Sequence, residues 1–151
     1  MIKATNIDYD VDWEDVQQNC TPEEIKRMFP DEIEIINGDK PVIEQREKRF
    51  IVYPSPWTGK EGWNGRKSAE LGGIITLEQG DHDQICRLDK KNAVFPLFLQ
   101  FLYKPDSKES VDLVCGYEQA IIENVPVWKL VNRGTEESAI LTHDTLCGEG
   151  Y

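Results

Sequence analysis

Residues 73–131 read GIITLEQGDHDQICRLDKKNAVFPLFLQFLYKPDSKESVDLVCGYEQAIIENVPVWKLV, and this stretch decides the fold class. Short apolar and β-branched runs flank two longer segments with helical spacing, which predicts strands at both ends and helices between them. The polar turn at Gly80–Asp83 predicts that the first two strands pair with each other. The predicted elements are strands at Gly73–Gln79 and Gln84–Leu88, a helix at Asp89–Tyr103 capped by Asp89 and kinked at Pro96, a helix from Asp106 or Ser107 to Asn124, and a strand at Val125–Val131. This order indicates an α/β or α+β domain.

The segment before residue 73 contributes further strands. Two runs separated by a polar turn predict strands at Pro41–Gln45 and Arg49–Tyr53. A strand at Glu32–Ile36 precedes the turn Asn37–Lys40, and residues 54–73 are predicted to form one long ordered loop because they hold five glycines and two prolines. Further toward the N-terminus, alternation predicts a strand at Ile7–Trp13, and Thr21-Pro22-Glu23-Glu24 predicts the start of a short helix that Pro30 stops. The tail from Thr135 fits a short helix or a strand.

Taken together, these patterns predict a single domain over residues 1–151, with a mixed sheet of about six to eight strands and three helices.

Acidic residues outnumber basic ones by 28 to 17, which leaves a net charge of −11. A field of that sign repels nucleic-acid phosphates and anionic lipid headgroups, so neither nucleic acid nor a membrane is an expected partner. No stretch approaches the roughly 20 apolar residues of a membrane span, and the first residues lack the pattern of a secretory signal. We therefore expect a cytoplasmic protein.

The residues that usually bind metals are too scattered here to predict a metal site. The four cysteines form no C-x-x-C pair, and only two histidines are present. The run Asp8, Asp10 and Asp12 resembles the start of a calcium loop, but Trp13 and Asn19 occupy the positions where that loop needs glycine and glutamate. An acidic outer face on a strand is the better interpretation.

Residues 54–67, PSPWTGKEGWNGRK, invite comparison with the phosphate-binding loop G-x-x-x-x-G-K-[ST]. Pro54 stands where that loop needs its first glycine, and Glu61 stands where it needs the serine or threonine that holds magnesium. A helix should also follow at once so that its N-terminal amides face the anion, but no helical spacing follows Glu61. We therefore expect no self-sufficient ATP-dependent kinase.

The same loop carries cations and aromatic rings in an otherwise acidic chain. Its candidate binding residues are Trp57, Gly59, Lys60, Trp63 and Arg66. One interpretation is that Lys60, Arg66 and Lys67 contact an anion and that the two tryptophans stack on a ligand ring. The alternative is that the cations pair with Glu61 and Glu70 on the surface and that the tryptophans anchor the loop by burial.

Four segments, EIEIINGDKPVI, RFIVYPSPWTGKEGWNGRKSAELGGIITLEQG, FLQFLYKP and VPVWKLV, occur in an order that resembles the C-terminal part of the HPr kinase-like proteins. These proteins belong to the phosphoenolpyruvate carboxykinase-like group of P-loop proteins. The resemblance covers residues 33–139, with S-P-W-x-G-K-E-G as its most specific piece, whereas residues 1–30 diverge. It implies the fold of that group for this chain.

Two departures from the family bear on activity. The family has a phosphate loop about two dozen residues before its N-x-D-K-P turn, and this chain has a short predicted helix there. The family turn usually carries two adjacent acids, and Gly38 replaces the first, which leaves Asp39 as the remnant of the metal or base site. By position, Lys60 and Arg66 would face phosphate or the acceptor substrate. The structural alternative is that Asp39 only caps its turn.

Three functions follow as hypotheses. The preferred one is a non-catalytic binding or regulatory module without a cofactor, which recognises a protein or peptide partner or a small anion through residues 54–67. The second is one subunit of a split kinase whose phosphate loop lies on another chain, in which case ATP and magnesium would bind to the pair. The third is an acidic interaction or immunity-type protein that uses the acidic strand Asp8–Glu14. A P-loop fold that lacks its first half should expose an apolar face, and a homodimer would cover that face.

Overall fold

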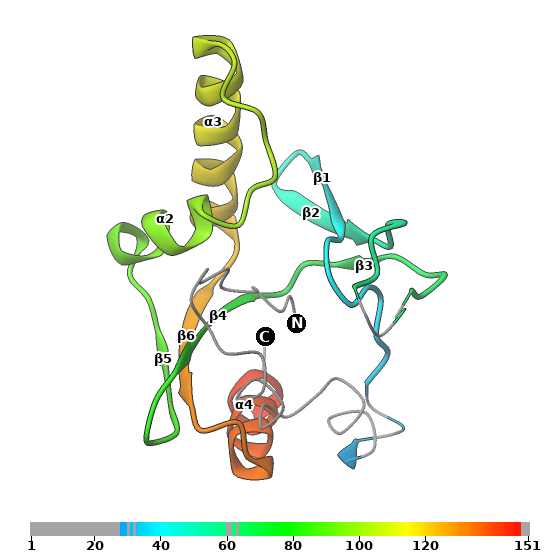
Figure 1. Cartoon of the computed structure of the whole chain (residues 1–151), viewed down its shortest axis with the longest axis vertical. Coiled ribbons are helices and arrows are strands. Elements are labelled where there is room, and N and C mark those ends of the chain that lie inside the picture. Colours follow the sequence, from blue (N-terminus) through cyan, green and yellow to red (C-terminus); the bar gives the residue numbers. More distant parts are fainter. Residues whose placement is uncertain (1–27, 30, 32, 60–61, 63, 149–151) are drawn as a thin grey trace.

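A computed structural model describes residues 28, 29, 31, 33–59, 62 and 64–148 (Figure 1). Within these residues the chain forms six strands, arranged in two sheets of three strands each, and three helices. The mixed α and β character of the prediction is confirmed. A single larger sheet was predicted, and this is wrong for the described residues. The strand predicted at Ile7–Trp13 and the start of the helix predicted from Thr21 lie outside them.

The first sheet is antiparallel, in the order β1-β2-β3. Its hairpin joins β1 (Val42–Arg46) to β2 (Arg49–Tyr53), which confirms the two strands predicted there. The third strand, β3 (Ala69–Glu70), lies inside the segment predicted to be loop throughout and pairs with β2. The strand predicted at Glu32–Ile36 is wrong over its described residues 33–36, because only a single bridge, between Asn37 and Asn64, forms next to them.

The second sheet has the order β4-β6-β5, with β4 (Ile74–Gln79) parallel to β6 (Val127–Asn132) and β5 (Gln84–Arg87) antiparallel to it. The predicted pairing of β4 with β5 is therefore wrong. The reason is the burial of β6, which has Val127 buried in one core and Trp128 and Leu130 buried in the other. A strand with buried side chains on both faces is typical of the centre of a sheet.

The helices follow their sequence signals closely at the start and less well at the end. In α2 (Lys90–Phe98) the Asp89 carboxylate accepts the Asn92 N–H, and in α3 (Lys108–Asn124) the Ser107 hydroxyl accepts the Ser110 N–H. Helix α2 ends five residues before the predicted Tyr103, because i→i+3 hydrogen bonds tighten the chain directly after Pro96. The ambiguous tail is a helix, α4 (Glu136–Gly148).

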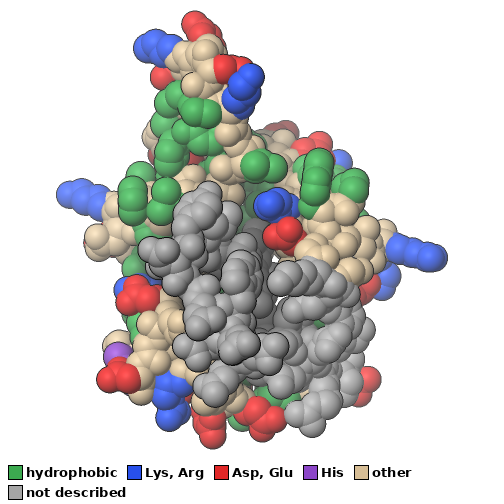
Figure 2. Space-filling model, viewed as in Figure 1, with side chains coloured by type: hydrophobic (Ala, Val, Ile, Leu, Met, Phe, Trp, Pro, Cys, Tyr) green, Lys and Arg blue, Asp and Glu red, His purple; other side chains and the backbone are tan. Residues whose placement is uncertain are grey.

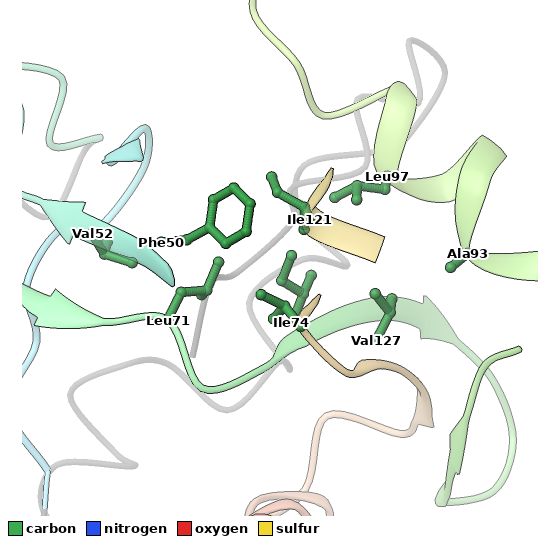
Figure 3. Close-up of a cluster of buried hydrophobic side chains, with 9 residues drawn as sticks. Phe50, Val52, Leu71, Ile74, Ala93, Leu97, Ile121 and Val127 are labelled. Carbon is green, nitrogen blue, oxygen red and sulfur yellow. The ribbon is translucent and has the colours of Figure 1, made fainter. Parts of the chain in front are cut away.

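The main core lies between the two sheets and beneath α2 and α3 (Figures 1 and 3). Phe50, Val52 and Leu71 approach it from the first sheet and its connection, and Ile74 and Val127 approach it from the second sheet. Helices α2 and α3 close it with Ala93, Leu97 and Ile121. Full burial of one such aliphatic or aromatic side chain contributes about 1.5–3 kcal/mol. This core therefore joins the first sheet firmly to the second.

A second core covers the opposite face of the β4-β6-β5 sheet. Ile75, Trp128 and Leu130 are buried there, against Leu141 and Leu146 of α4. No helix in the described part of the chain is both long enough and apolar enough to cross a membrane.

Candidate functional site

The start of the glycine-rich loop is anchored by Ser55, which is only 4% exposed. Its hydroxyl donates to the Lys40 carbonyl and accepts the Trp57 N–H at 3.2 Å. The Asn37 side-chain NH₂ donates to the Ser55 backbone carbonyl at 3.2 Å, and the Asn37 side-chain Oδ1 accepts the Asp39 N–H at 2.9 Å. This network ties the turn at residues 37–40 to the loop at residues 55–57.

Two glycines bring the loop close to the same turn. Gly59 has φ = 69°, and a Cβ atom at this position would lie 3.3 Å from the Asp39 Cβ. Gly65 donates its N–H to the Ile36 carbonyl at 2.7 Å, and a Cβ atom there would lie 2.8 Å from the Ile35 carbonyl oxygen. Only glycine fits such an approach without a backbone shift. The two glycines therefore hold both arms of the loop against residues 35–40.

Three of the predicted binding residues, Trp57, Gly59 and Arg66, and also Asp39, lie on the two segments that meet at this junction of the turn at residues 37–40 with the loop at residues 54–67. Trp57 is 57% exposed, so the alternative in which it anchors the loop by burial is wrong. The Asp39 side chain is half-buried. Its carboxylate accepts no hydrogen bond from a described residue and forms no ion pair with one. Gly59 lies against Asp39, whereas Arg66 is exposed on the far arm of the loop. The other two candidates, Lys60 and Trp63, lie outside the described residues.

The cations of the loop differ in their partners. The Lys67 ammonium lies 3.1 Å from a Glu34 carboxylate oxygen, and both side chains are exposed. In the alternative interpretation the loop cations pair with Glu70, but its carboxylate oxygen lies 3.8 Å from a guanidinium nitrogen of Arg49 instead. Arg66 is exposed and makes no ion pair with any described residue.

Sequence reasoning missed Ser55 and Asn37 as the residues that hold the site together. Ser55 stands between Pro54 and Pro56, and this was the signal that could have indicated it: neither proline has an N–H, so the serine hydroxyl becomes the local polar contact. Asn37 was predicted only as part of a turn, and its i to i+2 hydrogen bond to Asp39 is typical of such a turn.

The chemistry that this arrangement allows is recognition by several different groups. It presents an aromatic ring at Trp57, a carboxylate at Asp39 and a guanidinium at Arg66. No group of three or more histidine, cysteine, aspartate or glutamate side chains that could hold a metal occurs among the residues that the structure describes. The junction has a hydrogen-bond acceptor and a donor, but no nucleophile held by a base within its described residues.

No protein-family model, curated protein or solved structure matches this chain in comparisons with known proteins. The resemblance of residues 33–139 to the HPr kinase-like proteins therefore stays a prediction.

Proposed function

We propose that the chain is a non-catalytic binding module of the HPr kinase-like type, which recognises a peptide segment of a protein partner at residues 54–67. The observation that carries the proposal is the exposed Trp57 indole on a loop anchored by Ser55. Tryptophan and arginine are the side chains most often responsible for binding energy at protein interfaces. A loop that is already held in place also loses little conformational entropy when it binds.

A peptide suits the three groups of the junction better than a simple anion does. Its side chains can pack on Trp57, its carboxylates or carbonyls can accept from Arg66, and its N–H groups can donate to the half-buried Asp39 carboxylate. A phosphate or other small anion would be repelled by Asp39 and would leave Trp57 in water. Lys60 and Trp63 are expected to extend the contact, since they belong to the same loop.

The same residues argue against independent phosphoryl transfer. Such transfer depends on positioning the phosphoryl group and neutralising its charge, usually with a phosphate cradle and magnesium. Pro54 and Glu61 remove the cradle from this loop, and Gly38 leaves Asp39 as the single acid of its turn. We therefore expect no binding of ATP with magnesium in calorimetric titrations of the isolated chain.

The test is a selection from a random peptide library against the purified chain, followed by calorimetric affinities for the selected peptides. Trp57→Ala and Arg66→Ala should each weaken binding at least tenfold. Lys104→Ala, at an exposed cation outside the loop, is the matched control and should leave the affinity unchanged. Binding that both loop variants retain in full would refute the proposal, as would tight binding of ATP with magnesium by the wild-type chain.

A split kinase is the second candidate, and the Asp39 carboxylate favours it. This side chain lies half-buried on a turn fixed by Asn37 and has no partner among the described residues. Such a carboxylate suits a residue that binds a metal or accepts a proton from a substrate hydroxyl. Its test is reconstitution with a chain that carries G-x-x-x-x-G-K-[ST] from a neighbouring reading frame. Phosphoryl transfer by the pair, lost in Asp39→Asn, would establish this function in place of the first.

A further inference from the structure

A groove of about 460 Å³ lies between α2 and α3, on elements that the 54–67 loop does not use. Its lining includes Val94 of α2 and Cys115, Glu118 and Ile122 of α3, with Lys90 and Lys91 at the start of α2. Hydrophobic side chains are visible on the surface over both helices in Figure 2. A volume of this size is typical of small-molecule sites.

Glu118 is the unusual residue of this groove. It is only 4% exposed, and its Oε1 atom is buried without a hydrogen-bond partner. A glutamate is almost never buried to this degree unless it is paired, because an uncompensated carboxylate loses its hydration. Burial raises the pKa of Glu118, and the backbone N–H of Phe98 opposes part of that rise. The side chain therefore lacks one donor that a ligand can supply.

The lysines of the groove do not supply that donor. Lys90 and Lys91 lie in the first turn of α2, whereas Phe98, whose N–H approaches the Glu118 carboxylate, is the last residue of that helix. Phe98 follows Lys91 by seven positions in the helix, which corresponds to about 10 Å along the axis. Neither lysine makes an ion pair with any residue that the structure describes. Glu123 also lines the groove, and its carboxylate accepts from Gln119 at 2.9 Å.

We propose that the α2–α3 groove binds a small organic cation, an ammonium or guanidinium group on an aliphatic stem, with Glu118 as its anchor. The stem packs on Val94 and Ile122, and the charged head donates to the Glu118 Oε1 atom. The net charge of −11 also attracts a cation and raises its concentration near the surface. This site is independent of the proposed peptide contact at Trp57.

The experiment uses n-hexylammonium chloride as the probe and the alkylation of Cys115 by iodoacetamide as the readout. Cys115 lines the groove three residues before Glu118, so a bound ligand should cover it. Exposed Cys86 and Cys147 report general effects in the same sample, because peptide mapping separates the cysteines. At millimolar probe we expect Cys115 to react at least threefold more slowly, while Cys86 and Cys147 keep their rates.

The charge dependence is tested with a neutral probe and with two variants. The uncharged 1-hexanol should protect Cys115 much less than hexylammonium does. Glu118→Gln should abolish the protection, whereas Glu109→Gln, which removes an exposed charge from the first turn of the same helix, should retain it. Equal protection by the two probes, full protection in Glu118→Gln, or no protection at all would overturn the proposal. The comparison of probes needs only the wild-type chain, so it decides the matter even if Glu118→Gln does not fold.

Discussion

The Asp83 carboxylate connects the turn before β5 to Arg133, which follows β6, and to the start of α4. Its replacement by asparagine gives the sharpest stability test. Asp83 accepts hydrogen bonds from the Ser138 hydroxyl of α4, from the Arg133 backbone N–H at 2.9 Å, and from the Arg133 guanidinium at 2.9 and 2.7 Å. Its side chain is only 10% exposed. Asp83→Asn keeps the shape and removes the charge that these donors stabilise.

The size of the effect follows from the pKa of this group. The Ser138 and Arg133 hydrogen bonds lower the pKa of Asp83 from 3.8 to about 2. At about 1.4 kcal/mol for each tenfold change in the acid constant, this fall corresponds to roughly 2.5 kcal/mol of unfolding free energy at neutral pH. Water screens the half-exposed Arg133 partner, so we expect about 1–2 kcal/mol to be lost in Asp83→Asn.

The pH dependence supplies the check. Because the pKa is lower in the folded than in the unfolded chain, the stabilisation is complete above the unfolded pKa of 3.8 and is lost as the pH falls toward about 2. Urea unfolding, followed by circular dichroism at pH 7 and pH 3, should therefore show the difference between wild type and Asp83→Asn shrinking by about half. Asp112→Asn, at an exposed ion pair with Lys108, is the control and should have a much smaller effect. A difference that stays constant with pH would refute the reasoning.

Three further predictions concern contacts that hold the first sheet and its loop. Gly65→Ala would place a Cβ atom 3.0 Å from the Ile36 Cα, so its urea midpoint should fall by an amount equivalent to about 1–3 kcal/mol, whereas Gly72→Ala, which has nothing within 4 Å, should change little. Ser55→Ala removes two part-buried hydrogen bonds, to the Lys40 carbonyl and from the Trp57 N–H, which should cost about 1–3 kcal/mol for the two in the same assay and should speed amide exchange in the adjoining turn. Tyr117→Phe removes the hydroxyl that donates to a β1 carbonyl but keeps the ring contacts, so chemical unfolding should show a loss of about 0.5–1.5 kcal/mol.

The elements that sequence reasoning predicted best are those whose signals lie within a few residues. The strands on either side of residues 47 and 48 and the helix starts at Asp89 and Ser107 are examples. Hairpin turns and helix caps are local, because the residues that form them are nearly adjacent in the chain. Such signals identify an element without saying which neighbours it packs against.

The errors have non-local causes. The placement of β6 between β4 and β5 depends on the burial of Val127, Trp128 and Leu130 against elements far away in the sequence. In the candidate site, the loop residues were named from their chemistry, but chemistry does not tell which of them is buried: Ser55 is buried and Trp57 is exposed. Neither the position of β6 in its sheet nor the exposure of Trp57 can be predicted from the pattern of one segment alone.

The central position of β6 has a consequence for synthesis. Strands β4 and β5 each form their ladder with β6, which is translated after both of them and after α2 and α3. A ribosome-bound chain that ends before Val127 therefore holds two strands with unsatisfied backbone groups, a state prone to aggregation. Nascent chains released at that length should require a chaperone to stay dispersed, and chains that include residue 132 should not.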